Sequence, residues 1–132
     1  MKKNKTVKIG CASAFWGDTS SAAPQLVHSK SIDYLVFDYL AEVTMSILAD
    51  AKMKNPDLGY ATDFIKHISP LLNDITKQGI KVISNAGGIN LKSCRNAVLE
   101  EAKKAGIKLN IAIVEGDNLI SREKTLRSLP VK

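Results

Sequence analysis

The chain has 132 residues, of which 45% are hydrophobic and 24% are charged, and this predicts one soluble globular domain with its own core. The net charge is +6, but residues 2–8 carry +4 and residues 122–132 carry +3, which leaves −1 on the body between them. A nucleic-acid surface gathers its basic residues on a folded face, so this distribution argues against nucleic acid as a partner. The apolar stretches are too short to span a membrane and the basic start does not lead into a secretory signal, so we expect a cytoplasmic protein without a membrane partner.

The charge distribution also suggests how the chain is divided. We expect a basic, disordered N-terminus (1–6), a single α/β domain (7–120) and a basic C-terminal tail (121–132). Cys11 and Cys94 are too few for a disulfide framework and lack the spacing of metal ligands. We therefore expect both to be buried small hydrophobic residues.

Strand-like runs alternate with helical patterns along the domain. The expected strands are 7–12, 34–37, 80–84 and 108–114, and the expected helices are 23–29, 39–54, 62–78 and 91–105. The run 34–37 is apolar throughout, which favours a central strand buried on both faces. Helix 39–54 carries one apolar stripe, in which Leu40, Val43, Ile47 and Ala51 recur at helical spacing with Thr44 and Leu48 beside them.

This order of elements requires parallel strand pairing through right-handed crossovers. We predict an open, parallel, four-stranded sheet flanked by helices, a Rossmann-like three-layer α/β fold. The first half of a (β/α) barrel has the same order of elements and stays open as the alternative. Ser69-Pro70 predicts a kink or a new helix start within 62–78, and Gly79 and Gly106 predict left-handed helix ends.

The loops that follow the four expected strands are polar or rich in glycine, and in a parallel sheet they meet at one edge. The candidate site residues there are Gly17, Asp18, Asp38, Glu42, Asn85, Gly87, Gly88, Asn90, Glu115 and Asp117. Asp38 and Glu42 are the candidates for acid–base catalysis or for binding Mg²⁺, and helix capping is the simpler alternative. The glycines of the loop 85–90 and the helix that follows suit a phosphate or a carboxylate, unless the loop is a plain tight turn.

The tryptophan and the two histidines help to limit the chemistry expected at the polar edge. Trp16, the single tryptophan, lies in the first loop, and we favour its packing into the core over a role as a lid. Neither His28 nor His67 lies in a segment expected to reach the polar edge. A serine or cysteine nucleophile paired with histidine is therefore poorly supported.

Several motifs are distributed over the expected domain. They are Ile9–Cys11, Phe15–Asp18, Asp33–Met45, Leu58–Phe64, Gly79–Gly88 with Asn90, and Val114–Asp117. Together they resemble the N-terminal part of the acyclic terpene utilisation AtuA family. The resemblance implies a role in the breakdown of acyclic isoprenoids such as citronellol and geraniol, or of other branched acyl compounds, but it supplies no catalytic residue and no reaction.

Two functions follow from these observations. The first is an enzyme domain that binds a small carboxylate or an acyl-CoA-type substrate. Mg²⁺ and a CoA-linked substrate are the candidates for its cofactor. The alternative is a non-catalytic ligand-binding or subunit module. Members of the family continue for several hundred residues, so we expect a truncated or split-gene chain that self-associates or needs a partner subunit.

Overall fold

The computed structural model describes residues 6–130 and contains a parallel sheet of three strands. The strands are β1 (Ile9–Ser13), β2 (Tyr34–Phe37) and β3 (Lys81–Ser84), side by side in that order. The α-helices are α1 (Ala22–His28), α2 (Glu42–Lys54), α3 (Thr62–Ile68), α4 (Leu72–Gln78), α5 (Leu91–Lys104) and α6 (Glu123–Arg127). The predicted α/β class and parallel pairing are confirmed. The N-terminus expected to be disordered lies, apart from Thr6, outside the described residues.

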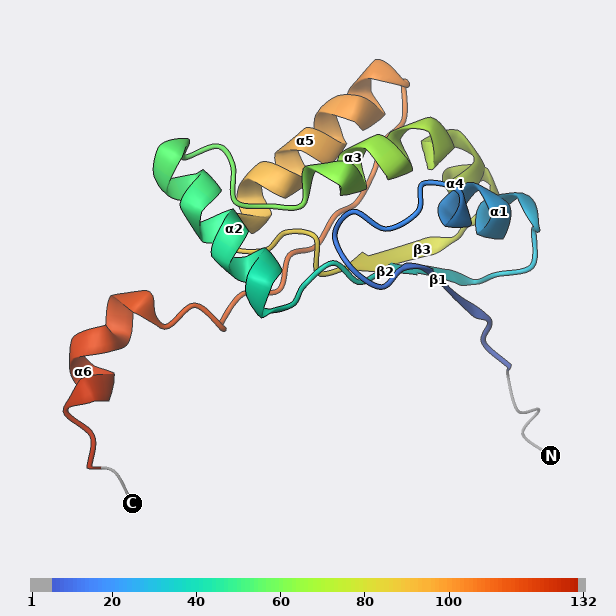
Figure 1. Cartoon of the computed structure of the whole chain (residues 1–132). Coiled ribbons are helices and arrows are strands. Elements are labelled where there is room, and N and C mark those ends of the chain that lie inside the picture. The colour runs from blue at the N-terminus through green and yellow to red at the C-terminus, as the bar shows by residue number, and fades with distance from the viewer. Residues whose placement is uncertain (1–5, 131–132) are drawn as a thin grey trace.

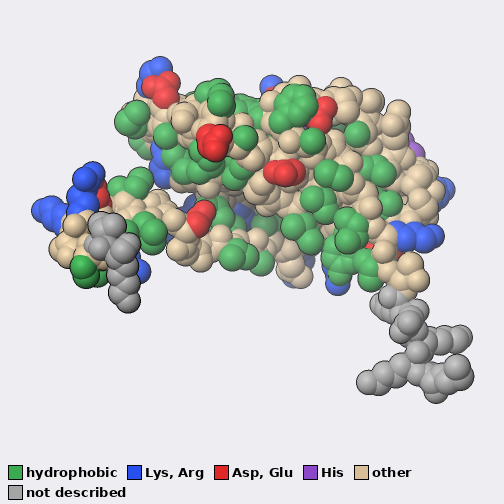
Figure 2. Space-filling model, turned by 60° about the horizontal axis from the view of Figure 1, so that its bottom comes forward, with side chains coloured by type: hydrophobic (Ala, Val, Ile, Leu, Met, Phe, Trp, Pro, Cys, Tyr) green, Lys and Arg blue, Asp and Glu red, His purple; other side chains and the backbone are tan. Residues whose placement is uncertain are grey.

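The helices α1, α3, α4 and α5 lie on one side of the sheet (Figure 1). Leu35 and Phe37 of β2 point to that side and are buried, whereas Ile9 of β1 points to the other side and is 66% exposed. Figure 2 turns that other face forward and shows hydrophobic side chains at its surface. Right-handed crossovers between consecutive strands place every connecting helix on the same side. The expected three-layer arrangement, with the central strand buried on both faces, is therefore wrong for the described residues.

The core lies between the sheet and the helices and has three aromatic rings at its centre. Phe37 and Phe64 meet edge to face with ring centroids 5.2 Å apart, and Phe37 and Tyr39 are stacked at 6.0 Å. Such aromatic arrangements add to the stabilisation from the buried area alone. Trp16 is half-buried and packs against this core, in agreement with the packing role expected for it.

Residues 108–114 keep the alternation of a strand but do not pair with β3, so the predicted fourth strand is wrong here. Leu109, Ile111 and Ile113 are half-buried, and the residues between them are exposed. The Nε of Arg95 in α5 donates to the carbonyl of Ile111 at 3.3 Å, so a side chain engages the backbone of this segment. Alternation reports which side chains face the core, and it does not report whether the backbone pairs.

Three helix ends follow the sequence signals and one does not. Gly79 and Gly106, both with φ of 69°, follow α4 and α5 in the left-handed conformation. The 3₁₀ turn η1 (Ser69–Leu71) separates α3 from α4, which is the kink alternative. α2 begins at Glu42, later than expected, and its N-cap Ala41 makes no side-chain cap bond, so Asp38 does not cap it.

The C-terminal residues 117–130, which we term the arm, run away from the body beyond α2 (Figure 1). The arm contains the 3₁₀ turn η2 (Ile120–Arg122) and α6, so the segment expected to be a basic tail has helical structure in its described part. None of the helices between residues 6 and 130 combines the length and the apolarity needed to cross a bilayer.

The two cysteines differ in accessibility, so the expectation that both are buried is correct only for Cys94. Cys94 is buried in α5, and this burial raises the pKa of its thiol to about 11. Cys11 is exposed on the open face of the sheet.

We expect iodoacetamide to alkylate Cys11 and to spare Cys94 in the folded protein at mildly alkaline pH, because the thiolate is the reactive form. Mass spectrometry of tryptic peptides measures this difference. In urea-unfolded protein, the control, both thiols react. Equal alkylation of the two cysteines before unfolding would contradict the packing of α5.

Candidate functional site

The loops that follow β2 and β3 are joined by side-chain hydrogen bonds at the carboxyl edge of the sheet. The Nδ2 of Asn85 donates to Oδ1 of Asp38 at 2.7 Å, and Oδ1 of Asn85 accepts the amide of Tyr39 at 2.8 Å. The hydroxyl of Ser13, at the end of β1, donates to the carbonyl of Asp38 at 3.3 Å. The structure thus brings Asp38 and Asn85 together from neighbouring strands, where ligands bind in open α/β sheets.

Beneath this edge lies a pair of groups that the sequence analysis missed. Tyr39 is fully buried, and burial raises the pKa of its phenol to about 12. Its hydroxyl lies 3.2 Å from Nδ1 of His67, which is half-buried in α3. His67 follows Phe64 by three residues, so helical spacing places it beside the buried stripe of α3. That spacing was the available signal.

The loop after β1 is held in shape by hydrogen bonds between its own residues. Oδ2 of Asp18 accepts the amide of Ala14 at 2.9 Å, and Oδ1 accepts the amide of Thr19 at 2.7 Å. These two backbone hydrogen bonds hold the pKa of Asp18 below its usual value. Gly17 has a φ of 93°, so it supplies the left-handed residue that this tight loop needs. Asp18 and Gly17 therefore have a structural explanation, and ligand binding by them stays a prediction.

The remaining acids are exposed. Glu42 is the first residue of α2, and its carboxylate takes part in none of the hydrogen bonds or ion pairs between described residues. Glu115 and Asp117 follow the unpaired segment, and Asp117 lines the cavity described below. The structure holds Asp38 in place by a contact to Asn85, and it shows no comparable contact for Glu42.

Backbone groups of the loop 85–90 form hydrogen bonds with one another. The amide of Gly88 donates to the carbonyl of Asn85 at 3.1 Å, and the amide of Asn90 donates to the carbonyl of Gly87 at 2.8 Å. These bonds are typical of tight turns, and a plain tight turn was the alternative to an anion site. Anion binding by the amides of this loop stays a prediction.

Asn90 caps α5 as predicted, since its Oδ1 accepts the amide of Ser93 at 3.4 Å. Its Nδ2 donates to the carbonyl of Pro56 at 2.8 Å and to that of Leu58 at 2.7 Å. Asn90 therefore fastens the loop after α2 to the start of α5. Both polar atoms of its side chain therefore form hydrogen bonds that hold the fold together.

Gly87 and Gly88 allow close packing around the same loop. A Cβ on Gly87 would lie 3.1 Å from Cγ of Leu91. A Cβ on Gly88 would lie 2.5 Å from Cδ1 of Leu48 and 2.8 Å from the carbonyl oxygen of Gly59. These glycines position the loop against α2 and α5.

A cavity of about 750 Å³ opens between β3, α5 and the unpaired segment 109–114. Most of its lining is apolar and comes from α3, α4, α5, β3 and that segment. The apolar residues include Phe64, Ile68, Leu72, Val82, Val98, Leu109, Ile111 and Ile113. Pockets that hold small molecules occupy about 300–1,000 Å³ and are mostly apolar with a few polar groups. The failure of segment 109–114 to pair with β3 is what leaves this space.

Polar groups line the cavity at both ends of β3, with Lys81 at the amino end and the loop 85–88 at the carboxyl edge. Asn85, Gly87 and Gly88 line it, and so does Arg95, which is exposed and held by its bond to the carbonyl of Ile111. A guanidinium is well suited to a carboxylate or a phosphate. The arrangement can hold an apolar chain inside and an anionic head group at the opening.

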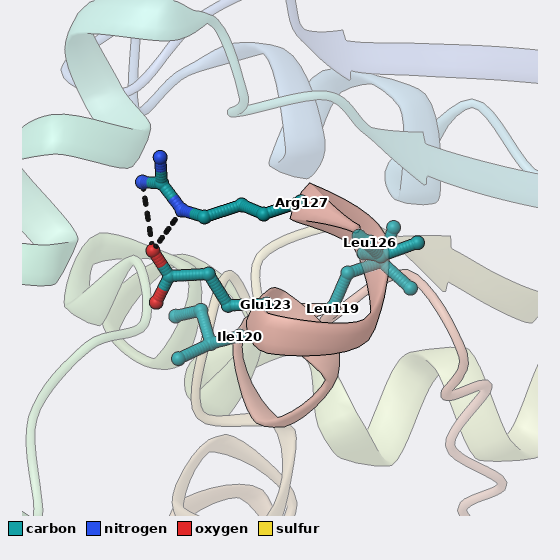
Figure 3. A pocket seen from close by; sticks show the side chains of 5 residues that line it. All are labelled: Leu119, Ile120, Glu123, Leu126 and Arg127. Atoms are coloured by element: carbon teal, nitrogen blue, oxygen red, sulfur yellow. Dashed lines mark hydrogen bonds and ion pairs between the residues drawn. The ribbon is translucent and has the colours of Figure 1, made fainter. Parts of the chain in front are cut away.

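Metal ligation gains no support from the geometry. Among residues 6–130, no three His, Cys, Asp or Glu side chains are grouped so that they could hold a metal ion. Asp38 and Glu42 thus stay a candidate pair of oxygen ligands without a third carboxylate nearby. A second, shallow hollow lies on the arm, away from the sheet edge, and it contains none of the candidate site residues (Figure 3).

Comparison with known protein families matches residues 7–131 to the family described as "Acyclic terpene utilisation family protein AtuA". The searches of curated proteins and of solved structures gave no match. The matched range includes all three strands, the Asp38–Asn85 bridge and every residue of the cavity lining. The motifs from which the resemblance was inferred are thus supported over nearly the whole chain, and the protein belongs to the acyclic terpene utilisation AtuA family.

Proposed function

We propose that the protein binds an acyclic, methyl-branched carboxylate, or the acyl thioester of one, in the course of acyclic terpene breakdown. The observation that carries this proposal is the apolar cavity of about 750 Å³ with Arg95 and the loop 85–88 in its lining. Its apolar lining suits an isoprenoid chain, and family membership supports that class of compound. Arg95 pairs with the anionic head group.

Asp38 is the candidate acid–base group of this proposal. Asn85 lines the cavity and donates to Asp38, so this carboxylate is fixed next to the opening. A fixed carboxylate within reach of a bound head group can move a proton. The alternative is a non-catalytic binding module. It is favoured by Glu42, because no contact between described residues holds the carboxylate of Glu42 in place.

Isothermal titration calorimetry with citronellate tests the binding, and we expect saturable heat. Arg95→Ala weakens the affinity about 10- to 100-fold, because a hydrogen bond to a charged group contributes about 1.5–3 kcal/mol. Lys92→Ala is the matched control: Lys92 is also an exposed cation of α5 but does not line the cavity. Citronellol, which lacks the carboxylate, binds Arg95→Ala and the unaltered protein equally.

Two results would contradict the proposal. One is the absence of saturable heat with citronellate. The other is an unchanged affinity for citronellate in Arg95→Ala. Hydrogen exchange of the β3 amides shows whether the cavity is present in solution, because strand pairing with segment 109–114 would close it and slow the exchange of those amides. Asp38→Asn then separates the two functions: an enzyme loses turnover of citronellyl-CoA and keeps binding, whereas a non-catalytic module binds with either residue and shows no turnover with either.

A further inference from the structure

One side of α2 is apolar and uncovered by the described part of the chain. Val43 is 71% exposed and Ile47, one turn later, is 50% exposed. The buried side of the helix is formed by Thr44 and Leu48. Val43 and Ile47, which we term the α2 stripe, belong to the apolar stripe expected from the sequence, and they are the part of it that faces solvent. Two adjacent exposed apolar side chains of this kind can form part of a contact with another surface.

The arm has an apolar side of its own. Leu119, Ile120 and Leu126 line its shallow hollow, next to the ion pair of Glu123 and Arg127 (Figure 3). Ile120 is 79% exposed. A helix of five residues, such as α6, is not stable in water by itself and depends on packing against another surface. Among the described residues, α6 packs mainly against the neighbouring turn η2.

The charges around these two surfaces are complementary. Glu42 is the first residue of α2 and Asp38 lies in the loop before it, whereas Arg122 and Lys124 lie in the arm. None of the ion pairs between described residues involves Glu42, Arg122 or Lys124. Complementary charges of this kind fix the register of an interface and exclude other partners.

We propose that two copies of the chain exchange arms, so that the arm of each copy packs on the α2 stripe of the other. The arm and the α2 stripe lie on the same chain. A two-fold axis between two copies therefore places an arm on each of the two α2 stripes. The arm runs away from its own body (Figure 1), which leaves it extended toward a second copy. Gly116, with a φ of 140° and open space around it, is the joint at the root of the arm. The exchange brings Arg122 next to Asp38 and Glu42 of the other copy, beside the candidate site.

Disulfide trapping between copies tests this arrangement. In a Cys11→Ser background, one sample carries Val43→Cys and the other carries Ile120→Cys. On mixing under oxidising conditions, we expect disulfide-linked dimers that contain one chain of each kind. Pairing Ile9→Cys with Ile120→Cys is the matched control: Ile9 is equally exposed but lies on the open sheet face, so it gives no cross-link.

Sedimentation equilibrium gives the second readout, with a dimer expected for the unaltered chain. Ile120→Asp weakens dimerisation at least about tenfold, because a charge is placed in an apolar contact. Arg122→Glu weakens it as well, and adding Glu42→Arg restores it. Circular dichroism shows that the exposed substitutions leave the fold intact.

Three results would overturn the proposal. A monomer at every concentration is the first. The second is an internal disulfide in the double variant Val43→Cys/Ile120→Cys together with no cross-link between copies, which would mean that the arm folds back on its own body. The third is binding of the arm to vesicles of anionic phospholipid without any dimer in solution.

Discussion

Replacing Gly88 by alanine is expected to lower the free energy of unfolding by about 3 kcal/mol, of which the left-handed backbone accounts for about 1 kcal/mol and overpacking for the rest. Gly88 has a φ of 51°, and the added Cβ would lie 2.5 Å from Cδ1 of Leu48 and 2.8 Å from the carbonyl oxygen of Gly59. The side chain of Leu48 can turn away, but the backbone of Gly59 cannot move without disturbing the loop before α3. Urea unfolding measured by circular dichroism gives the change.

Gly79→Ala is the control for that experiment. Gly79 also has a positive φ, 69°, but a Cβ there would meet nothing within 4 Å. Only the conformational part remains, about 1 kcal/mol. Equal losses in the two variants would show that the loop does not pack on α2 and Gly59 as described.

The largest loss is expected for Phe37→Ala, about 4 kcal/mol, the range found for truncating a buried phenylalanine. Phe37 is fully buried at the end of β2 and contacts both Tyr39 and Phe64. Its removal leaves a cavity at the centre of the core and takes away the ring against which Tyr39 stacks. The midpoint of urea unfolding measures the loss.

Phe15→Ala removes the same side chain from an exposed position and should change stability by no more than about 0.5 kcal/mol. Phe37→Leu keeps most of the volume and is the variant to use if Phe37→Ala does not fold. A loss for Phe37→Leu as small as that for Phe15→Ala would contradict the position of Phe37 in the core.

The parts of the fold that could be predicted from the sequence are those fixed by short-range patterns. The apolar run Tyr34–Phe37, the cap by Asn90 and the left-handed Gly79 each depend on a few neighbouring residues, and the structure confirms each of them. The meeting of Asp38 and Asn85 could also be predicted, because parallel strands bring their carboxyl ends to one edge.

The incorrect predictions depend on long-range geometry. An apolar strand and an apolar stripe indicate surfaces that avoid water, but they do not say whether this chain or another covers them, as Ile9 and Val43 show. The alternation in 108–114 is the same whether or not the backbone pairs with β3. The cavity and the position of Arg95 depend on that pairing, so they could not be predicted from the sequence.

The order of the strands also determines how the chain can fold as it is made. Tyr34 of β2 pairs with Ile9 of β1, and Lys81 of β3 pairs with Tyr34, so every strand joins one that the ribosome has already released. At about 5–20 residues per second, the β1–β2 unit and its covering helix α1 emerge within seconds, well before β3. No strand has to enter between two strands that are already paired. Synthesis therefore extends the sheet at a single growing edge, and among the described residues β3 is the last strand to be added.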